Sequence, residues 1–119
     1  MSDIPKYIIK RMIPQKGVNI KDDKIELTYL NLMHHMPVKN LSPLSVEILI
    51  DEEEADPFQT TLVIDPQEDP LPPGGKLIFS FPNTFGIKQG ETHKVSFEWF
   101  GGNVKKIELE RVIGPDKSK

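Results

Sequence analysis

Apolar residues recur at every second position in six short segments of this chain, and this alternation constrains the fold more than any other feature. Successive side chains of a β-strand point to opposite faces, so the pattern predicts strands that each turn one face toward a core. Residues that favour turns separate the segments. The six predicted strands cover residues 25–29, 46–50, 60–64, 77–81, 95–99 and 107–109.

A seventh segment, Lys6–Ile13, is also predicted as a strand, but it is apolar on both faces. Such a strand is fully covered only if it lies centrally in the fold or if a partner packs on it, because exposed sheet edges and faces commonly recruit other chains. We therefore expect Tyr7, Ile9 and Arg11 to contact a partner.

Composition agrees with a β fold. The chain has 13 isoleucines and 7 valines but a single alanine, Ala55, and β-branched residues favour strands whereas alanine favours helices. Its 11 prolines and 8 glycines leave little room for long helices. Seven strands in about 110 residues predict an all-β fold, a single two-sheet antiparallel β-sandwich of the immunoglobulin-like kind. A small β-barrel is the alternative.

Two finer features of the strands can be predicted. Gly101-Gly102 lies between alternating runs, and glycine accepts the positive φ of tight hairpin turns, so residues 93–100 and 104–113 should form an antiparallel hairpin. Adjacent apolar residues at Tyr29-Leu30 and at Val112-Ile113 interrupt the alternation and predict a β-bulge or bend at each place. We expect the domain to span residues 1–113 and the polar segment 114–119 to be a disordered tail.

Charge and cysteine content exclude several functions. Acidic residues outnumber basic ones by 18 to 15, and arginine occurs only twice, which argues against a nucleic-acid partner. The absence of cysteine excludes disulfides, thiolate nucleophiles, iron–sulfur clusters and the blue-copper site of some β-sandwiches. Asp3 and Pro5 do not suit a signal peptide, and no apolar run approaches the roughly 20 residues of a membrane span. We expect a cytoplasmic protein without a membrane partner.

The segment Met33-His34-His35-Met36 has two interpretations. Thioether and imidazole groups bind copper and similar soft metals, which predicts a metal site at His34 and His35. Adjacent residues of an extended chain point to opposite sides, however, and this makes a shared metal difficult. Methionines also form adaptable partner surfaces, which predicts instead that Met33 and Met36 contact another protein.

Aromatic residues divide into core and surface candidates. Phe85 lies in a loop, and Phe100 faces away from its neighbour Trp99, so these two phenylalanines are predicted partner contacts. Four others occupy inward positions of predicted strands and should form the core: Phe79, Phe81, Phe97 and Trp99.

No motif indicates catalysis. The chain lacks a Gly-x-Ser-x-Gly elbow and a phosphate-binding P-loop, and the acidic run Asp51–Glu54 lacks the ligand spacing of a calcium loop. We therefore expect neither an enzyme nor a bound cofactor. The segment 86–92, which precedes residues 94–99, resembles the loop-into-strand pattern of many immunoglobulin-like adhesive or accessory domains.

The sequence favours a non-enzymatic module that binds a protein partner or forms a homo-oligomer. The alternative is an accessory protein that binds a metal or a small ligand through residues 33–36.

Overall fold

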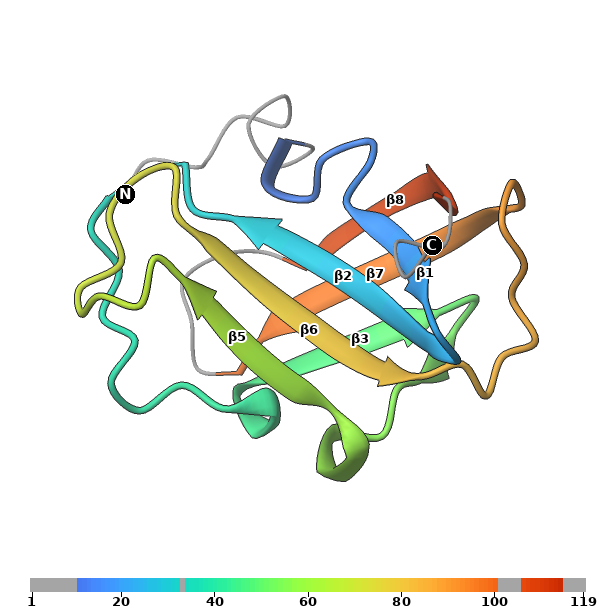
Figure 1. Ribbon diagram of the computed structural model, residues 1–119, viewed down its shortest axis with the longest axis horizontal. Helices are drawn as coiled ribbons and strands as arrows, with labels where there is room; N and C mark the ends of the chain where they lie inside the picture. Colours follow the sequence, from blue (N-terminus) through green and yellow to red (C-terminus); the bar gives the residue numbers. More distant parts are fainter. Residues whose placement is uncertain (1–10, 33, 101–105, 115–119) are drawn as a thin grey trace.

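The computed structural model describes residues 11–32, 34–100 and 106–114 (Figure 1). Within these residues the chain forms eight strands and two short 3-10 turns. One sheet has the order β1-β2-β6-β5 and the other has the order β4-β3-β7-β8. The elements are β1 (Val18–Lys21), β2 (Lys24–Leu30), η1 (Pro43–Ser45), β3 (Val46–Ile50), β4 (Glu53–Glu54), η2 (Pro57–Gln59), β5 (Thr61–Asp65), β6 (Lys76–Pro82), β7 (Thr92–Trp99) and β8 (Ile107–Val112).

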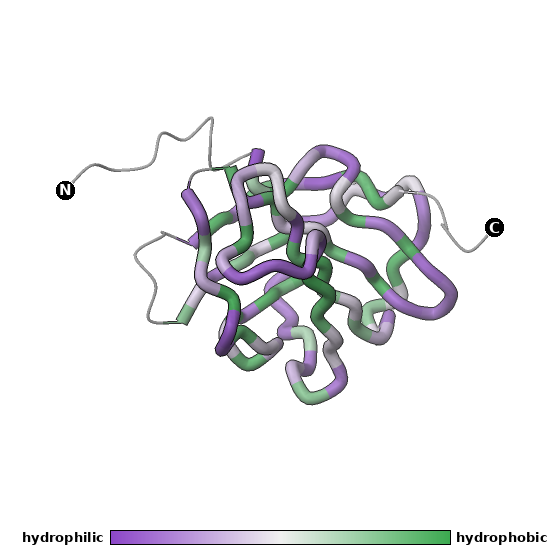
Figure 2. Tube along the Cα trace, turned by 60° about the vertical axis from the view of Figure 1, so that its left-hand side comes forward, coloured by the Kyte–Doolittle hydropathy of each residue, from purple (hydrophilic) through white to green (hydrophobic). Residues whose placement is uncertain are grey.

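All strand pairs inside the two sheets are antiparallel, and the two sheets pack face to face, which confirms the predicted β-sandwich. Hydrophobic and hydrophilic residues are interspersed along the chain (Figure 2). Along β6 it is burial that alternates: Leu77, Phe79 and Phe81 are buried whereas Ile78 and Ser80 are only half-buried. The alternation in the sequence therefore corresponds to the inner and outer faces of each sheet.

Four aromatic rings join the two sheets at the centre of the core. Tyr29 of β2 stacks on Phe97 of β7 with ring centroids 5.0 Å apart, and Trp99 meets Tyr29 edge-on at 5.4 Å. Phe79 of β6 meets Phe97 edge-on at 5.5 Å. Each such pair contributes about 0.5–1.5 kcal/mol beyond the burial of its area, so these rings are a main link between the sheets. Burial also raises the pKa of the Tyr29 hydroxyl above its ordinary value.

The predicted C-terminal hairpin is confirmed. β7 and β8 pair antiparallel from Thr92 opposite Val112 to Phe97 opposite Ile107, while its glycine turn lies outside the described residues. Neither predicted β-bulge is present: pairing of β2 with β6 continues without interruption through Leu30. At the second place, Val112-Ile113, the alternative of a bend between sheets holds, because the chain leaves β8 after Val112 and Gly114 pairs with Asn19 of the other sheet. In β8 the half-buried Arg111 takes the inward position and Val112 faces outward with 54% of its surface exposed, so the alternation is unbroken.

The strand count differs from the sequence prediction, with eight strands rather than seven. β1 and β4 were not predicted, because segments of four and two residues are too short to show a periodicity. The predicted N-terminal strand does not extend through its last three residues: Arg11 and Met12 are helical and Ile13 lies in a bend. This bend lets the adjacent side chains of Met12 and Ile13 both enter the core, which a strand does not allow. Residues 6–10 lie outside the described residues.

One side of the sandwich is joined by a bridge between the sheets. Asn19 of β1 pairs in parallel with Gly114, whose N–H donates to Val18 O at 2.9 Å. Gly114 therefore belongs to the folded domain rather than to the predicted tail, and residues 115–119 lie outside the described residues. No helix among the described residues is long and apolar enough to cross a membrane.

Candidate functional site

Two short capped turns present apolar side chains at one end of the sandwich. Each begins with a capping residue, a proline and a large apolar residue: Ser42-Pro43-Leu44 at η1 and Asp56-Pro57-Phe58 at η2. The Leu44 N–H donates to Ser42 Oγ at 3.1 Å, and the Phe58 N–H donates to Asp56 Oδ1 at 2.9 Å. Because the cap satisfies a backbone donor and proline fixes φ, both turns are held without burying their apolar residue.

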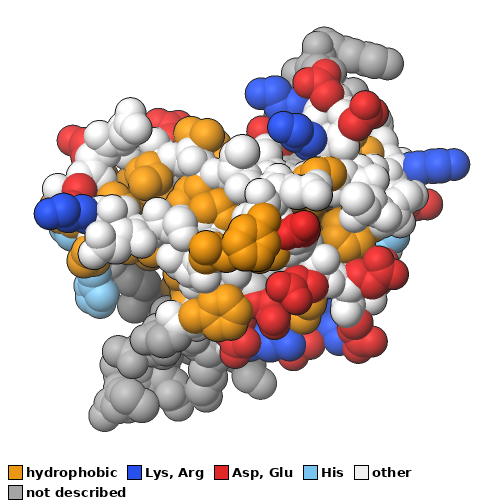
Figure 3. All heavy atoms as spheres, turned by 90° about the horizontal axis from the view of Figure 1, so that it is seen from below, with side chains coloured by type: hydrophobic (Ala, Val, Ile, Leu, Met, Phe, Trp, Pro, Cys, Tyr) orange, Lys and Arg blue, Asp and Glu red, His pale blue; other side chains and the backbone are white. Residues whose placement is uncertain are grey.

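The exposed apolar residues of this end form what we call the η1–η2 surface, defined as Leu44, Phe58 and Phe100. These side chains expose 54%, 83% and 58% of their surface. The two turns are in contact, and the Phe100 N–H donates to Ser45 O of η1 at 3.0 Å. Figure 3 views the side on which η1 and η2 lie and shows hydrophobic side chains over its middle, with acidic side chains beside them.

Two glutamates stand on the outer face of the sheet next to this surface. Glu47 of β3 lies directly opposite Glu98 of β7, two residues after η1 and two residues before Phe100. Like charges at directly opposite strand positions destabilise a sheet. Further along the same sheet, Lys94 Nζ lies 3.2 Å from Glu108 and 3.6 Å from Glu52, and its pKa is raised chiefly by the bond to Glu108. Among the described residues, neither Glu47 nor Glu98 has an ion pair.

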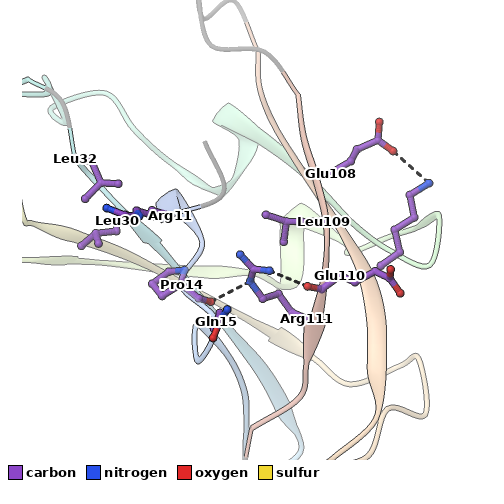
Figure 4. A pocket seen from close by; sticks show the side chains of 10 residues that line it. Arg11, Pro14, Gln15, Leu30, Leu32, Glu108, Leu109, Glu110 and Arg111 are labelled. Carbon is purple, nitrogen blue, oxygen red and sulfur yellow. Dashed lines mark hydrogen bonds and ion pairs between the residues drawn. The ribbon is translucent and has the colours of Figure 1, made fainter. Parts of the chain in front are cut away.

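A groove opens between the sheets on the side of β2 and β8. β1 pairs with β2 only as far as Leu27, so within the described chain no strand covers the last residues of β2 on this edge. The groove has a volume of about 1140 Å³, and Figure 4 shows Leu30 and Leu32 with Arg11 on one side and Leu109 with Arg111 on the other.

The two arginines of the groove differ in the hydrogen bonds that their guanidinium groups form. Arg111 donates from Nε and Nη2 to Ile13 O at 3.1 and 2.7 Å and from Nη1 to Glu110 O at 2.8 Å, so its guanidinium fastens the N-terminal segment to β8. Partial burial lowers the pKa of Arg111, which nonetheless remains charged at neutral pH. Arg11 is exposed and forms no hydrogen bond or ion pair within the described parts of the chain.

His93 lies between two carboxylates at the other end of β7. Its Nδ1 is 2.5 Å from Asp51 Oδ2, and its Nε2 is 3.0 Å from Glu91 Oε1. The bond to Glu91 raises the pKa of His93 most, and the bond to Asp51 adds to it. The same bonds lower the pKa values of Asp51 and Glu91. A neutral imidazole has one N–H, so only the charged ring donates to both partners.

The residues predicted from the sequence are scattered. Tyr7, Ile9 and Met33 lie outside the described residues. Phe85 is half-buried with its ring edge-on to Phe81 at 6.1 Å, so it covers the core, whereas Phe100 is exposed on the η1–η2 surface. The sequence prediction missed Leu44 and Phe58, although the repeated cap–proline–apolar pattern was a usable signal.

Residues 34–36 of the segment Met33-His34-His35-Met36 lie beside the loop between β5 and β6. Met36 forms an antiparallel bridge with Leu71 and packs half-buried against the core. His34 and His35 are both exposed. No group of three or more His, Cys, Asp or Glu side chains within the described ranges could hold a metal ion.

No protein-family model, curated protein or solved structure matches this chain.

Proposed function

We propose that this protein is a non-enzymatic, immunoglobulin-like module that binds another protein through the η1–η2 surface. The observation that carries the proposal is Phe58, whose side chain is 83% exposed on a turn held by the Asp56 cap. Exposed apolar groups that lie together mark binding sites on folded proteins, and aromatic residues dominate the binding energy of such sites.

The strand order supports the immunoglobulin-like part of the proposal. β1-β2-β6-β5 facing β4-β3-β7-β8 corresponds to strands A-B-E-D facing C′-C-F-G of immunoglobulin-like sandwiches. Many domains with this architecture bind other proteins, which supports a binding role by analogy of fold only.

The surroundings of His93 support the non-enzymatic part. Both of its ring nitrogens face carboxylates, so neither is open to take a proton from a substrate. His34 and His35 are exposed, and within the described residues they belong to no group of three or more His, Cys, Asp or Glu side chains that could hold a metal ion, so the structure adds no support to the alternative of a metal-binding protein.

A second candidate function is the binding of a small amphiphilic ligand in the groove beside Leu30 and Leu109. The observation that favours it is the exposed Arg11 guanidinium beside apolar walls, which suits an anionic head group with a hydrocarbon body. We place it second because the other two cations of the groove are already engaged: Arg111 is bonded to backbone carbonyls, and Lys94 pairs with Glu108.

The experiment that tests the first function is selection of random displayed peptides on the full chain. We expect a recurrent motif that binds the wild-type protein and is lost with Phe58→Ser. Val112→Ser is the matched control. Val112 is 54% exposed on β8 opposite the start of β7, whereas Phe100 follows the other end of β7, so this variant should leave binding unchanged. If every recovered motif binds both variants like the wild type, the η1–η2 surface is not the binding site.

A further inference from the structure

The η1–η2 surface carries a charge feature that the fold itself does not require. Glu47 and Glu98 face each other across β3 and β7 on the outer face of the sheet. Two carboxylates in this position repel each other, and a neutral pair would be better for the sheet alone. Both residues are half-buried rather than fully exposed, so solvent screens this repulsion only in part.

Another carboxylate of this sheet, Glu108, does have a cation beside it. At the far end of β7, Lys94 pairs with Glu108 and Glu52. Among the described residues, no cation is within ion-pair distance of Glu47 or Glu98. Glu47 and Glu98 therefore place two carboxylates without an ion pair in the described chain beside the exposed Leu44 and Phe100.

We propose that the partner at the η1–η2 surface is a protein segment that places a lysine or arginine beside a large apolar side chain. This inference rests on the proposed function and names the partner's chemistry. The apolar side chain would pack against Phe58 and Phe100, while the cation would lie between Glu47 and Glu98. Such an arrangement joins an apolar anchor to complementary charge at its edge, a combination that gives both affinity and specificity.

The same charges argue against a second copy of this chain as the occupant. A two-fold dimer uses one self-complementary patch on both subunits. If the η1–η2 surface formed that patch, the glutamate pairs of the two copies would approach each other, and the formal net charge of −3 on each chain would add to the repulsion.

The test uses the peptides selected on the full chain. We expect motifs in which Lys or Arg stands within a few residues of Phe, Leu, Ile or Trp, with affinity that falls as salt rises. The double variant Glu47→Gln with Glu98→Gln should weaken their binding by about tenfold. It should denature at the same urea concentration as the wild-type protein or at a higher one, since it removes a repulsion.

A matched double variant separates local from overall charge. Asp65→Asn with Glu68→Gln makes the same change in net charge at two exposed positions, the last residue of β5 and the loop that follows it, and it should leave binding within about twofold of the wild type. Equal weakening by both double variants would show a general charge effect and overturn the inference.

Other outcomes distinguish this inference from the proposed function. Neutral or acidic motifs that need Phe58, with affinity unchanged by Glu47→Gln and Glu98→Gln, would overturn the basic partner and keep the binding surface. A concentration-dependent dimer that Phe58→Ser abolishes would make a second copy the occupant and overturn the inference as well. Recovery of no motif that depends on Phe58 would overturn both proposals.

Discussion

Asn31 links the end of β2 to the loop before β6, and its replacement gives a sharp test of the local structure. The side chain is only 4% exposed. Its amide nitrogen donates to His34 O at 2.7 Å, to Leu71 O at 3.0 Å and to Pro72 O at 3.2 Å. One carboxamide therefore holds the start of the Met-His segment against the loop that follows β5. We predict that Asn31→Ala destabilises the protein.

The size of the effect depends on the hydrogen bonds that the three carbonyl oxygens keep after the substitution. Leu71 O and Pro72 O each accept a second bond, from backbone N–H groups at 2.8 and 2.9 Å, so they are not left without donors. His34 is exposed, and water can replace the lost donor at its carbonyl. The loss is therefore set by the net value of two N–H bonds, about 1 kcal/mol each, rather than by three unsatisfied carbonyls. We expect Asn31→Ala to cost about 1–3 kcal/mol.

Urea denaturation of Asn31→Ala and Asn31→Asp measures this prediction. The aspartate variant would direct a carboxylate at carbonyl oxygens, so at pH 7 it should be less stable than the alanine variant. Burial and these oxygens would raise the pKa of the new carboxyl, so the folded state would bind a proton more readily than the unfolded one, and stability should recover as the pH falls toward about 5. A loss below about 0.5 kcal/mol for Asn31→Ala, or an aspartate variant as stable as the alanine variant at pH 7, would show that the hydrogen bonds of the Asn31 amide do not stabilise this loop.

Two further predictions concern other parts of the fold. His93 has a raised pKa, so its bonds stabilise the folded state fully below its unfolded pKa of about 6.5, and this contribution is lost as pH rises through the folded pKa. The difference in unfolding free energy between the wild type and His93→Gln should therefore shrink at alkaline pH. An NMR titration of His93 should give a pKa that Asp51→Asn lowers; an equal His93 pKa in both proteins would contradict this. Gly114→Ala should cost about 1–3 kcal/mol in thermal unfolding, because the added Cβ would overlap the amide oxygen of the buried Asn19 and displace its bond to Lys16 O. An unchanged melting temperature would show that Asn19 moves freely.

The strands that the sequence predicts well are those whose inner faces are wholly apolar. Leu77, Phe79 and Phe81 are examples, because burial alternates with chain position and leaves the same alternation in the sequence. Arg111 shows where this reasoning fails. It takes an inward position because carbonyls of another segment receive its N–H groups, and no local pattern records such distant partners. This is why the pair Val112-Ile113 was predicted to mark a β-bulge or bend.

The candidate site was predicted only in part. Phe100 was predicted correctly as an exposed residue because strand alternation points its side chain to the face opposite that of its neighbour Trp99. The exposure of Phe58 follows from η2, which has no buried residue, and the approach of η1 to η2 is a contact between two turns that β3 and β4 separate in the chain. Sequence periodicity does not describe either event. The cap–proline pattern does indicate the two turns, but not that they meet.

NMR mapping of a selected peptide on the isotope-labelled protein shows which surface binds a partner. We expect amide shifts to change together at residues 42–48, 56–60 and 98–100, which hold the η1–η2 surface and its two glutamates. Phe58→Ser should weaken binding by about 30-fold or more, corresponding to a hot-spot loss of roughly 2 kcal/mol. Shift changes gathered instead around Leu30, Leu32 and Leu109, with affinity unaffected by Phe58→Ser, would exclude the η1–η2 surface and assign binding to the groove.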